Sequence, residues 1–115
     1  MPDYDARESN RRRPVREVPC RLQSRPDESF LLLDISETGF QLIGPEDLDV
    51  GEQSLIDIHY HAQHAHWTLP VLAELERVIP SASGGPATTG WSIVRHLSPT
   101  GPEILDEFLK RSCER

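Results

Sequence analysis

Cysteine, aromatic residues and long apolar runs are scarce in this sequence, and each shortage narrows what the protein can be. The 115 residues include only two cysteines, Cys20 and Cys113, and seven aromatic side chains. No apolar run approaches the roughly 20 residues that a membrane span needs, and the opening Met-Pro-Asp-Tyr-Asp is not typical of a secretory signal. We therefore expect a cytoplasmic protein without membrane contact, in which the two thiols are not joined in a disulfide.

Ten prolines and a short chain favour a single, loop-rich domain over a helical bundle. We expect residues 1–10 to be a disordered, polar tail and residues 11–112 to form the domain. Alternating apolar residues and turn signals predict six strands at about 18–22, 29–35, 39–43, 53–61, 66–79 and 90–97. Pro19 suggests an edge position for the first strand. An apolar stripe after Pro102 predicts a helix at about 102–112.

These elements predict a mostly β fold, a six-stranded Greek-key barrel with a short C-terminal helix and a flexible basic N-terminal arm. The positive charge is concentrated in that arm. Residues 7–25 carry seven arginines and two glutamates, a net charge of +5, whereas the whole chain has a formal net charge of -7. The acidic body would repel a long polyanion, while the arm could capture a small anion.

A short stretch between the second and third strands carries the best candidate for a ligand site. Asp34 and Ser36 are two residues apart, so on an extended backbone they would share a face. Gly39 could take a positive φ angle or let another segment come close. A carboxylate and a hydroxyl can read the donor edge of a guanine, and arginines can bind phosphates and the acceptor edge. The pattern predicts binding of an anionic guanine nucleotide.

The spacing Arg-x-x-x-Arg at Arg12 and Arg16, followed by Asp-x-Ser-x-x-Gly at Asp34, Ser36 and Gly39, closely resembles the PilZ domain family. The resemblance extends over about residues 10–111. It implies a six-stranded barrel that binds bacterial cyclic di-GMP, with Arg12 and Arg16 on phosphates and guanine Hoogsteen edges, Asp34 and Ser36 on a guanine base, and Gly39 shaping the turn. Arg11 and Arg13 flank the motif, and Arg11 could engage a second ligand molecule.

The same resemblance implies a non-catalytic receptor, without a cofactor, that passes the signal to a protein partner in motility, exopolysaccharide or biofilm control. Enzyme motifs such as Gly-x-Ser-x-Gly or a phosphate-binding Gly-x-x-x-x-Gly-Lys loop are missing from the sequence. One alternative is a PilZ-fold adaptor that binds protein, for instance in pilus assembly, without the nucleotide. Another is a nucleic-acid-binding barrel, which the acidic body disfavours.

Four histidines occur within eight residues, at His59, His61, His64 and His66. On a hairpin, such residues could gather imidazoles for zinc or nickel. A solvated hairpin explains the same pattern, and we favour that interpretation over a metal site.

Overall fold

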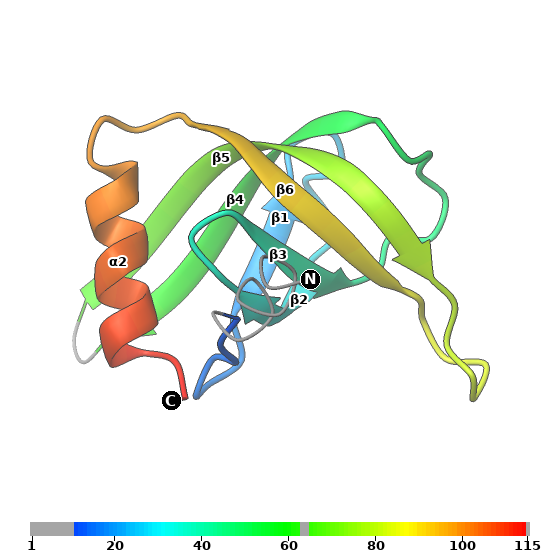
Figure 1. Cartoon of the computed structure of the whole chain (residues 1–115), viewed down its shortest axis with the longest axis horizontal. Helices are drawn as coiled ribbons and strands as arrows, with labels where there is room; N and C mark the ends of the chain where they lie inside the picture. The colour runs from blue at the N-terminus through cyan, green and yellow to red at the C-terminus, as the bar shows by residue number, and fades with distance from the viewer. Residues whose placement is uncertain (1–10, 63–64, 115) are drawn as a thin grey trace, which may run out of the picture.

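The computed structural model describes residues 11–62 and 65–114, so the predicted tail 1–10 lies outside the described residues. Six strands close into an antiparallel barrel in the order β1-β2-β3-β6-β5-β4 (Figure 1). Their bounds are β1 Pro19–Leu22, β2 Phe30–Ile35, β3 Gly39–Ile43, β4 Gln53–Ala62, β5 Ala65–Ile79 and β6 Thr88–His96. Helix α2 spans Gly101–Arg111. The predicted barrel and terminal helix are confirmed, with each boundary within two residues of the expected one.

The core forms where the inward-facing positions of the strands meet. Alternation along β4 and β5 buries Ile56 and Ile58 on one strand and Leu69, Val71 and Leu75 on the other. Every second residue is buried because successive side chains of a strand point to opposite faces of the sheet. Among the described residues, no helix is long and apolar enough to span a membrane.

Long-range pairing decides which residues share the outer surface. β3 pairs with β6, so Gly39 lies opposite Ser92 and Gln41 opposite Gly90. β5, with 15 residues, is long enough to pair with β4 over one part and with β6 over another. A register shift between Leu32 and Asp34 marks an irregularity in β2 as it pairs with β3.

Helix α2 lies beside the ends of β4 and β5 (Figure 1). Its predicted apolar stripe is confirmed, since Leu105, Phe108 and Leu109 are buried. The ring of Phe108 packs against Tyr60 of β4 with 4.4 Å between centroids. At roughly 1.5–3 kcal/mol for each large buried side chain, this contact surface contributes several kcal/mol of hydrophobic stabilisation.

The arginine-rich arm is held by the backbone on two sides. Arg12 exchanges two 2.9 Å hydrogen bonds with Ile35 at the end of β2. Pro14 forms a bridge with Cys113, and Val15 N donates to Ser112 O at 2.8 Å. The arm therefore lies between the end of β2 and the segment that follows α2.

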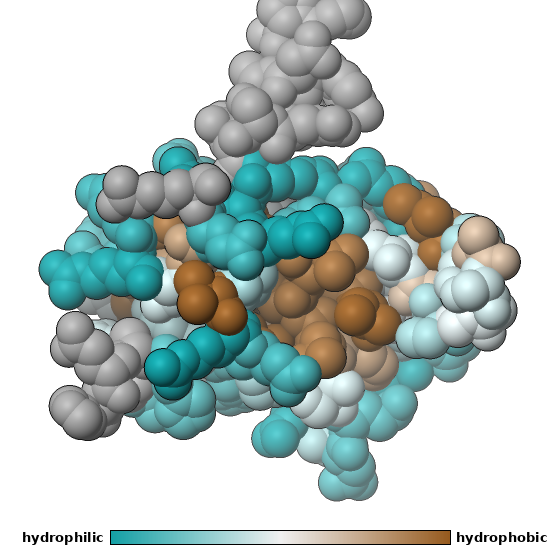
Figure 2. Space-filling view, turned by 90° about the horizontal axis from the view of Figure 1, so that it is seen from below, coloured by the Kyte–Doolittle hydropathy of each residue, from teal (hydrophilic) through white to brown (hydrophobic). Residues whose placement is uncertain are grey.

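The expected edge position of the first strand needs correction. β1 is not an edge strand, because it pairs with both β2 and β4. Pro19 is tolerated as its first residue, since pairing with β4 begins only at Cys20. Trp67 alternates with the buried Leu69 and Val71 along β5, but 42% of it is exposed. Seen from below, the largest hydrophobic area lies near the middle of the surface and is framed by hydrophilic side chains (Figure 2).

Candidate functional site

Four strands bring one row of residues together across the outside of the barrel. Asp34 of β2 lies opposite Gln41 of β3, Gln41 lies opposite Gly90 of β6, and Gly90 lies opposite Arg77 of β5. Arg77 extends over Gly90, where an added Cβ would lie 3.0 Å from Arg77 Cγ and 3.1 Å from its Nε. The missing side chain at Gly90 therefore leaves the space that the arginine occupies.

The arm adds a second arginine to this row. Arg11 Nη1 lies 3.7 Å from Asp34 Oδ1. With its amide oriented to satisfy its neighbours, Gln41 Oε1 accepts hydrogen bonds from Arg11 Nη1 and, at 3.1 Å, from Arg77 Nη2. One neutral amide thus holds two guanidinium groups beside one carboxylate. This excess of positive charge suits an anion better than a cation.

The carboxylate of Asp34 is partly buried and incompletely hydrogen-bonded. Its Oδ1 is buried, and no donor among the described residues hydrogen-bonds to it. Burial raises the pKa of the Asp34 carboxyl above its ordinary value, and the charges of Arg11, Arg77 and Arg13 offset this only in part. A buried acceptor without a donor is costly, so the site is suited to a ligand that brings N–H groups.

Ser36 and Gly39 build the turn beside this row. Ser36 is buried, its N donates to Gly39 O at 2.8 Å, and its Oγ accepts from Thr38 N at 3.3 Å. Gly39 is not among the glycines with positive φ, contrary to one of the two roles considered for it. The other role, close approach of a second segment, is confirmed, since an added Cβ would lie 2.4 Å from the Trp91 carbonyl oxygen.

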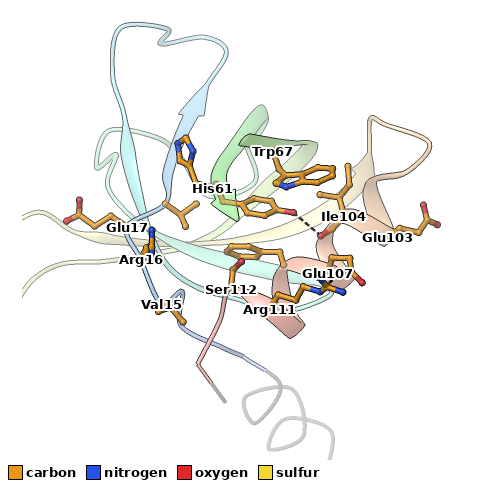
Figure 3. A pocket seen from close by; sticks show the side chains of 13 residues that line it. Val15, Arg16, Glu17, His61, Trp67, Glu103, Ile104, Glu107, Arg111 and Ser112 are labelled. Carbon is orange, nitrogen blue, oxygen red and sulfur yellow. Dashed lines mark hydrogen bonds and ion pairs between the residues drawn. The ribbon is translucent and has the colours of Figure 1, made fainter. Parts of the chain in front are cut away.

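The four arginines predicted to bind the ligand do not all lie at the Asp34 row. Arg11 reaches the row, and Arg13 is close enough to influence the Asp34 carboxyl. Arg12 bonds β2 through its backbone, while its side chain is exposed and influences the Cys113 thiol. Arg16 lies apart from the row, in a groove beside α2 (Figure 3).

Comparison with solved structures finds two informative similarities. The Bacillus subtilis inhibitor of motility MotI/DgrA matches with a TM-score of 0.70 at 14% identity, over 87% of this chain and 47% of that one. The PilZ domain of Escherichia coli YcgR, solved with c-di-GMP, matches with a TM-score of 0.59 at 18% identity, over 87% of this chain and 86% of that one. The chain has a PilZ-like fold. It spans about half the length of MotI/DgrA. Searches by sequence found no matching family model and no matching curated protein.

The groove beside α2 is a hollow with a volume of about 730 Å³. Its apolar lining comes from the arm, β4, β5 and α2, and includes Val15, Val18, Tyr60, Trp67, Ile104 and Phe108. Tyr60 Oη donates to Ile104 O at 3.3 Å, as the dashed line in Figure 3 shows. Arg16 lines the same groove, together with an ion pair of 2.8 Å between Arg111 and Glu107.

The structure brings three of the four clustered histidines together. His61 lies opposite His66 across the β4–β5 hairpin, and the ring of His59 stacks on that of His66. His64 lies outside the described residues. Within the described ranges, no group of three or more His, Cys, Asp or Glu side chains is arranged to hold a metal ion.

Sequence reasoning missed Gln41 and Arg77, which complete the row at Asp34. Gln41 reaches Asp34 through the local pairing of β2 with β3. Arg77 reaches Gln41 only because β6 pairs with both β3 and β5, and local patterns do not specify the distant β3–β6 pairing. Gly90 was the one feature of the sequence that could have indicated this contact. A glycine inside a strand often marks a close approach of another group, and here that group is the Arg77 side chain.

Proposed function

We propose that this chain is a non-catalytic receptor for cyclic di-GMP that relays the signal to a protein partner. The observation that carries the proposal is the Asp34 row, in which a buried carboxylate oxygen, to which none of the described residues donates a hydrogen bond, lies beside the guanidinium groups of Arg11 and Arg77. The PilZ-like fold supports it, since the similar domain of YcgR was solved with this nucleotide.

The chemistry of the ligand matches the charges of the row. Cyclic di-GMP carries two phosphodiester anions and two guanines. In the proposed complex, Asp34 accepts hydrogen bonds from guanine N1–H and N2–H, which gives its Oδ1 the donors that the described residues do not supply. Arginine forks bind phosphate oxygens or the O6 and N7 edge in a bidentate way that lysine cannot reproduce.

The arm contributes the remaining arginines in this proposal. Arg12 and Arg16 bind phosphates and guanine edges, and Ser36 and Gly39 shape the turn that receives the base. Because Arg16 now lines the groove beside α2, its participation requires residues 13–16 to change their path. That movement would break the hydrogen bond from Val15 N to Ser112 O, which links ligand binding to a change near α2.

A thiol-dependent reaction has no support in the surroundings of the cysteines. Both are buried free thiols. Burial raises the pKa of the Cys113 thiol to about 11, and it raises the pKa of the Cys20 thiol further. Nucleophilic cysteines instead need a lowered pKa, so neither cysteine is suited to act as a nucleophile.

The direct test is calorimetric titration of the purified chain with cyclic di-GMP. We expect micromolar or tighter binding, and a loss of roughly 2 kcal/mol, about 30-fold, in both Arg12→Ala and Arg16→Ala because each removes one partner of a charged pair. Arg95→Ala, an exposed arginine on β6, is the control and should bind like the wild type. Undiminished affinity in both arm variants would remove the arm from the mechanism.

Replacement of Arg77 tests the part of the site that only the structure reveals. Arg77→Ala is expected to weaken cyclic di-GMP binding by about tenfold, since it removes a charged donor and one of the two hydrogen bonds to Gln41 Oε1. Arg77→Lys should recover only part of the affinity, because an ammonium group lacks the planar fork. Equal affinities of wild type and Arg77→Ala would place the ligand away from the row.

A further inference from the structure

The β4–β5 hairpin carries a pair of imidazoles whose nitrogens almost touch. His61 and His66 are direct cross-strand partners, and His61 Nε2 lies 3.2 Å from His66 Nδ1. Their rings meet edge to face, with 4.5 Å between centroids and 67° between planes. Both side chains are exposed, so the pair is accessible from solvent.

This separation is close to the one that two ligands of the same metal ion require. Zinc binds imidazole nitrogen at about 2.0–2.1 Å, so two nitrogens at a tetrahedral angle lie roughly 3.3 Å apart. At 3.2 Å, the two nitrogens already have the required separation, and the rings would have to turn so that both lone pairs point at the ion. A hydrogen bond joins the two nitrogens, and the ion would replace its proton.

Within the described part of the chain, the pair supplies two protein ligands. The ring of His59 stacks on that of His66, but no group of three or more metal-binding side chains is arranged there to hold an ion. Water would fill the other positions. Imidazole ligands favour late first-row ions such as zinc, nickel and copper, whereas magnesium prefers oxygen ligands.

We propose that His61 and His66 form a surface chelate that binds one divalent transition-metal ion per chain. The site is separate from the Asp34 row, because it lies on the β4–β5 hairpin at the edge of the groove beside α2, where Figure 3 shows His61. Its existence does not depend on nucleotide binding. A bound ion would add positive charge at the edge of that groove.

Zinc chloride and magnesium chloride are the probes, titrated calorimetrically into the untagged chain in a buffer that does not bind metals. Zinc is expected to bind at one ion per chain, and magnesium is expected to give no heat of binding. His61→Gln and His66→Gln should each weaken zinc binding at least tenfold, since each leaves a single imidazole. Both positions are exposed, so the variants should melt like the wild type.

His96→Gln is the matched control, because His96 lies on β6 away from the hairpin. It should bind zinc as the wild type does. The imidazole signals of His61 and His66 should shift in NMR spectra on zinc addition, while that of His96 stays in place. Zinc affinity that is unchanged in His61→Gln and His66→Gln, or reduced equally in His96→Gln, would overturn the proposal.

Discussion

Asp34→Asn is expected to weaken cyclic di-GMP binding by about 100-fold, because the amide presents a donor where the guanine needs an acceptor. The same substitution is expected to raise, and not lower, the melting temperature. The Asp34 carboxyl has a raised pKa because burial opposes its charge more than the arginines favour it. Removing that charge should therefore stabilise the free protein while it damages the site.

The pH dependence gives this prediction a second signature. Since the folded-state pKa of Asp34 is above its ordinary value of 3.8, the folded protein gains stability from the protonated form at low pH. That gain is lost as the pH rises through the folded-state pKa. The stability advantage of Asp34→Asn over the wild type should thus be small below pH 3.8 and grow toward pH 7.

Melting curves with and without cyclic di-GMP, recorded across this pH range, measure both effects. Asp47→Asn is the matched control, because Asp47 is exposed and its pKa is lowered by the hydrogen bond from Arg25 at 2.8 Å. That variant should keep full nucleotide affinity and should not gain stability. If Asp34→Asn instead lowers the melting temperature at pH 7, Asp34 stabilises the turn and the proposed role is wrong.

Gly39→Ala is expected to destabilise the fold by about 3 kcal/mol, near the upper end for overpacking a tight site. An added Cβ would lie 2.4 Å from the Trp91 carbonyl oxygen. This neighbour is backbone and belongs to β6, so relief of the clash requires β3 and β6 to separate. The same displacement would move Gln41, so nucleotide binding should weaken as well.

Urea denaturation of Gly39→Ala and the wild type measures this loss directly. Gly85→Ala is the control, because its nearest neighbour would be Ser81 Oγ at an ordinary contact distance of 3.6 Å. We expect Gly85→Ala to remain within about 0.5 kcal/mol of the wild type. A similarly small change in Gly39→Ala would show that the two strands accommodate a methyl group, and that the close approach at Gly39 is not needed.

Local patterns in the sequence were sufficient for the strands and the helix. Alternation at Ile56 and Ile58 predicted β4, and the stripe that includes Leu105 and Phe108 predicted α2, because burial on one face leaves a period in the sequence. The turn from Asp34 to Gly39 was found through its glycine and its polar residues. The roles of these residues toward a nucleotide stay predictions.

Other features depend on contacts that no local pattern records. Arg77 joins Asp34 only because β3 pairs with β6 and β6 with β5. Arg16 lies in the groove beside α2 because the arm bonds to Ser112, a contact between the two ends of the domain. Trp67 alternates correctly with Leu69, but it lies near the hairpin end of β5 and lines the groove, where it is partly exposed.

Closure of the barrel has a consequence for any protein partner. Each of the six strands has a neighbour on both sides, but β1 pairs with β4 only at Ile56, Asp57 and Ile58, and β6 pairs with β5 only from Val71 onward. Strand addition, in which a partner extends an open sheet edge, is therefore confined to the parts of the β4–β5 hairpin beyond these pairings. Over the rest of the barrel, a partner must recognise side chains.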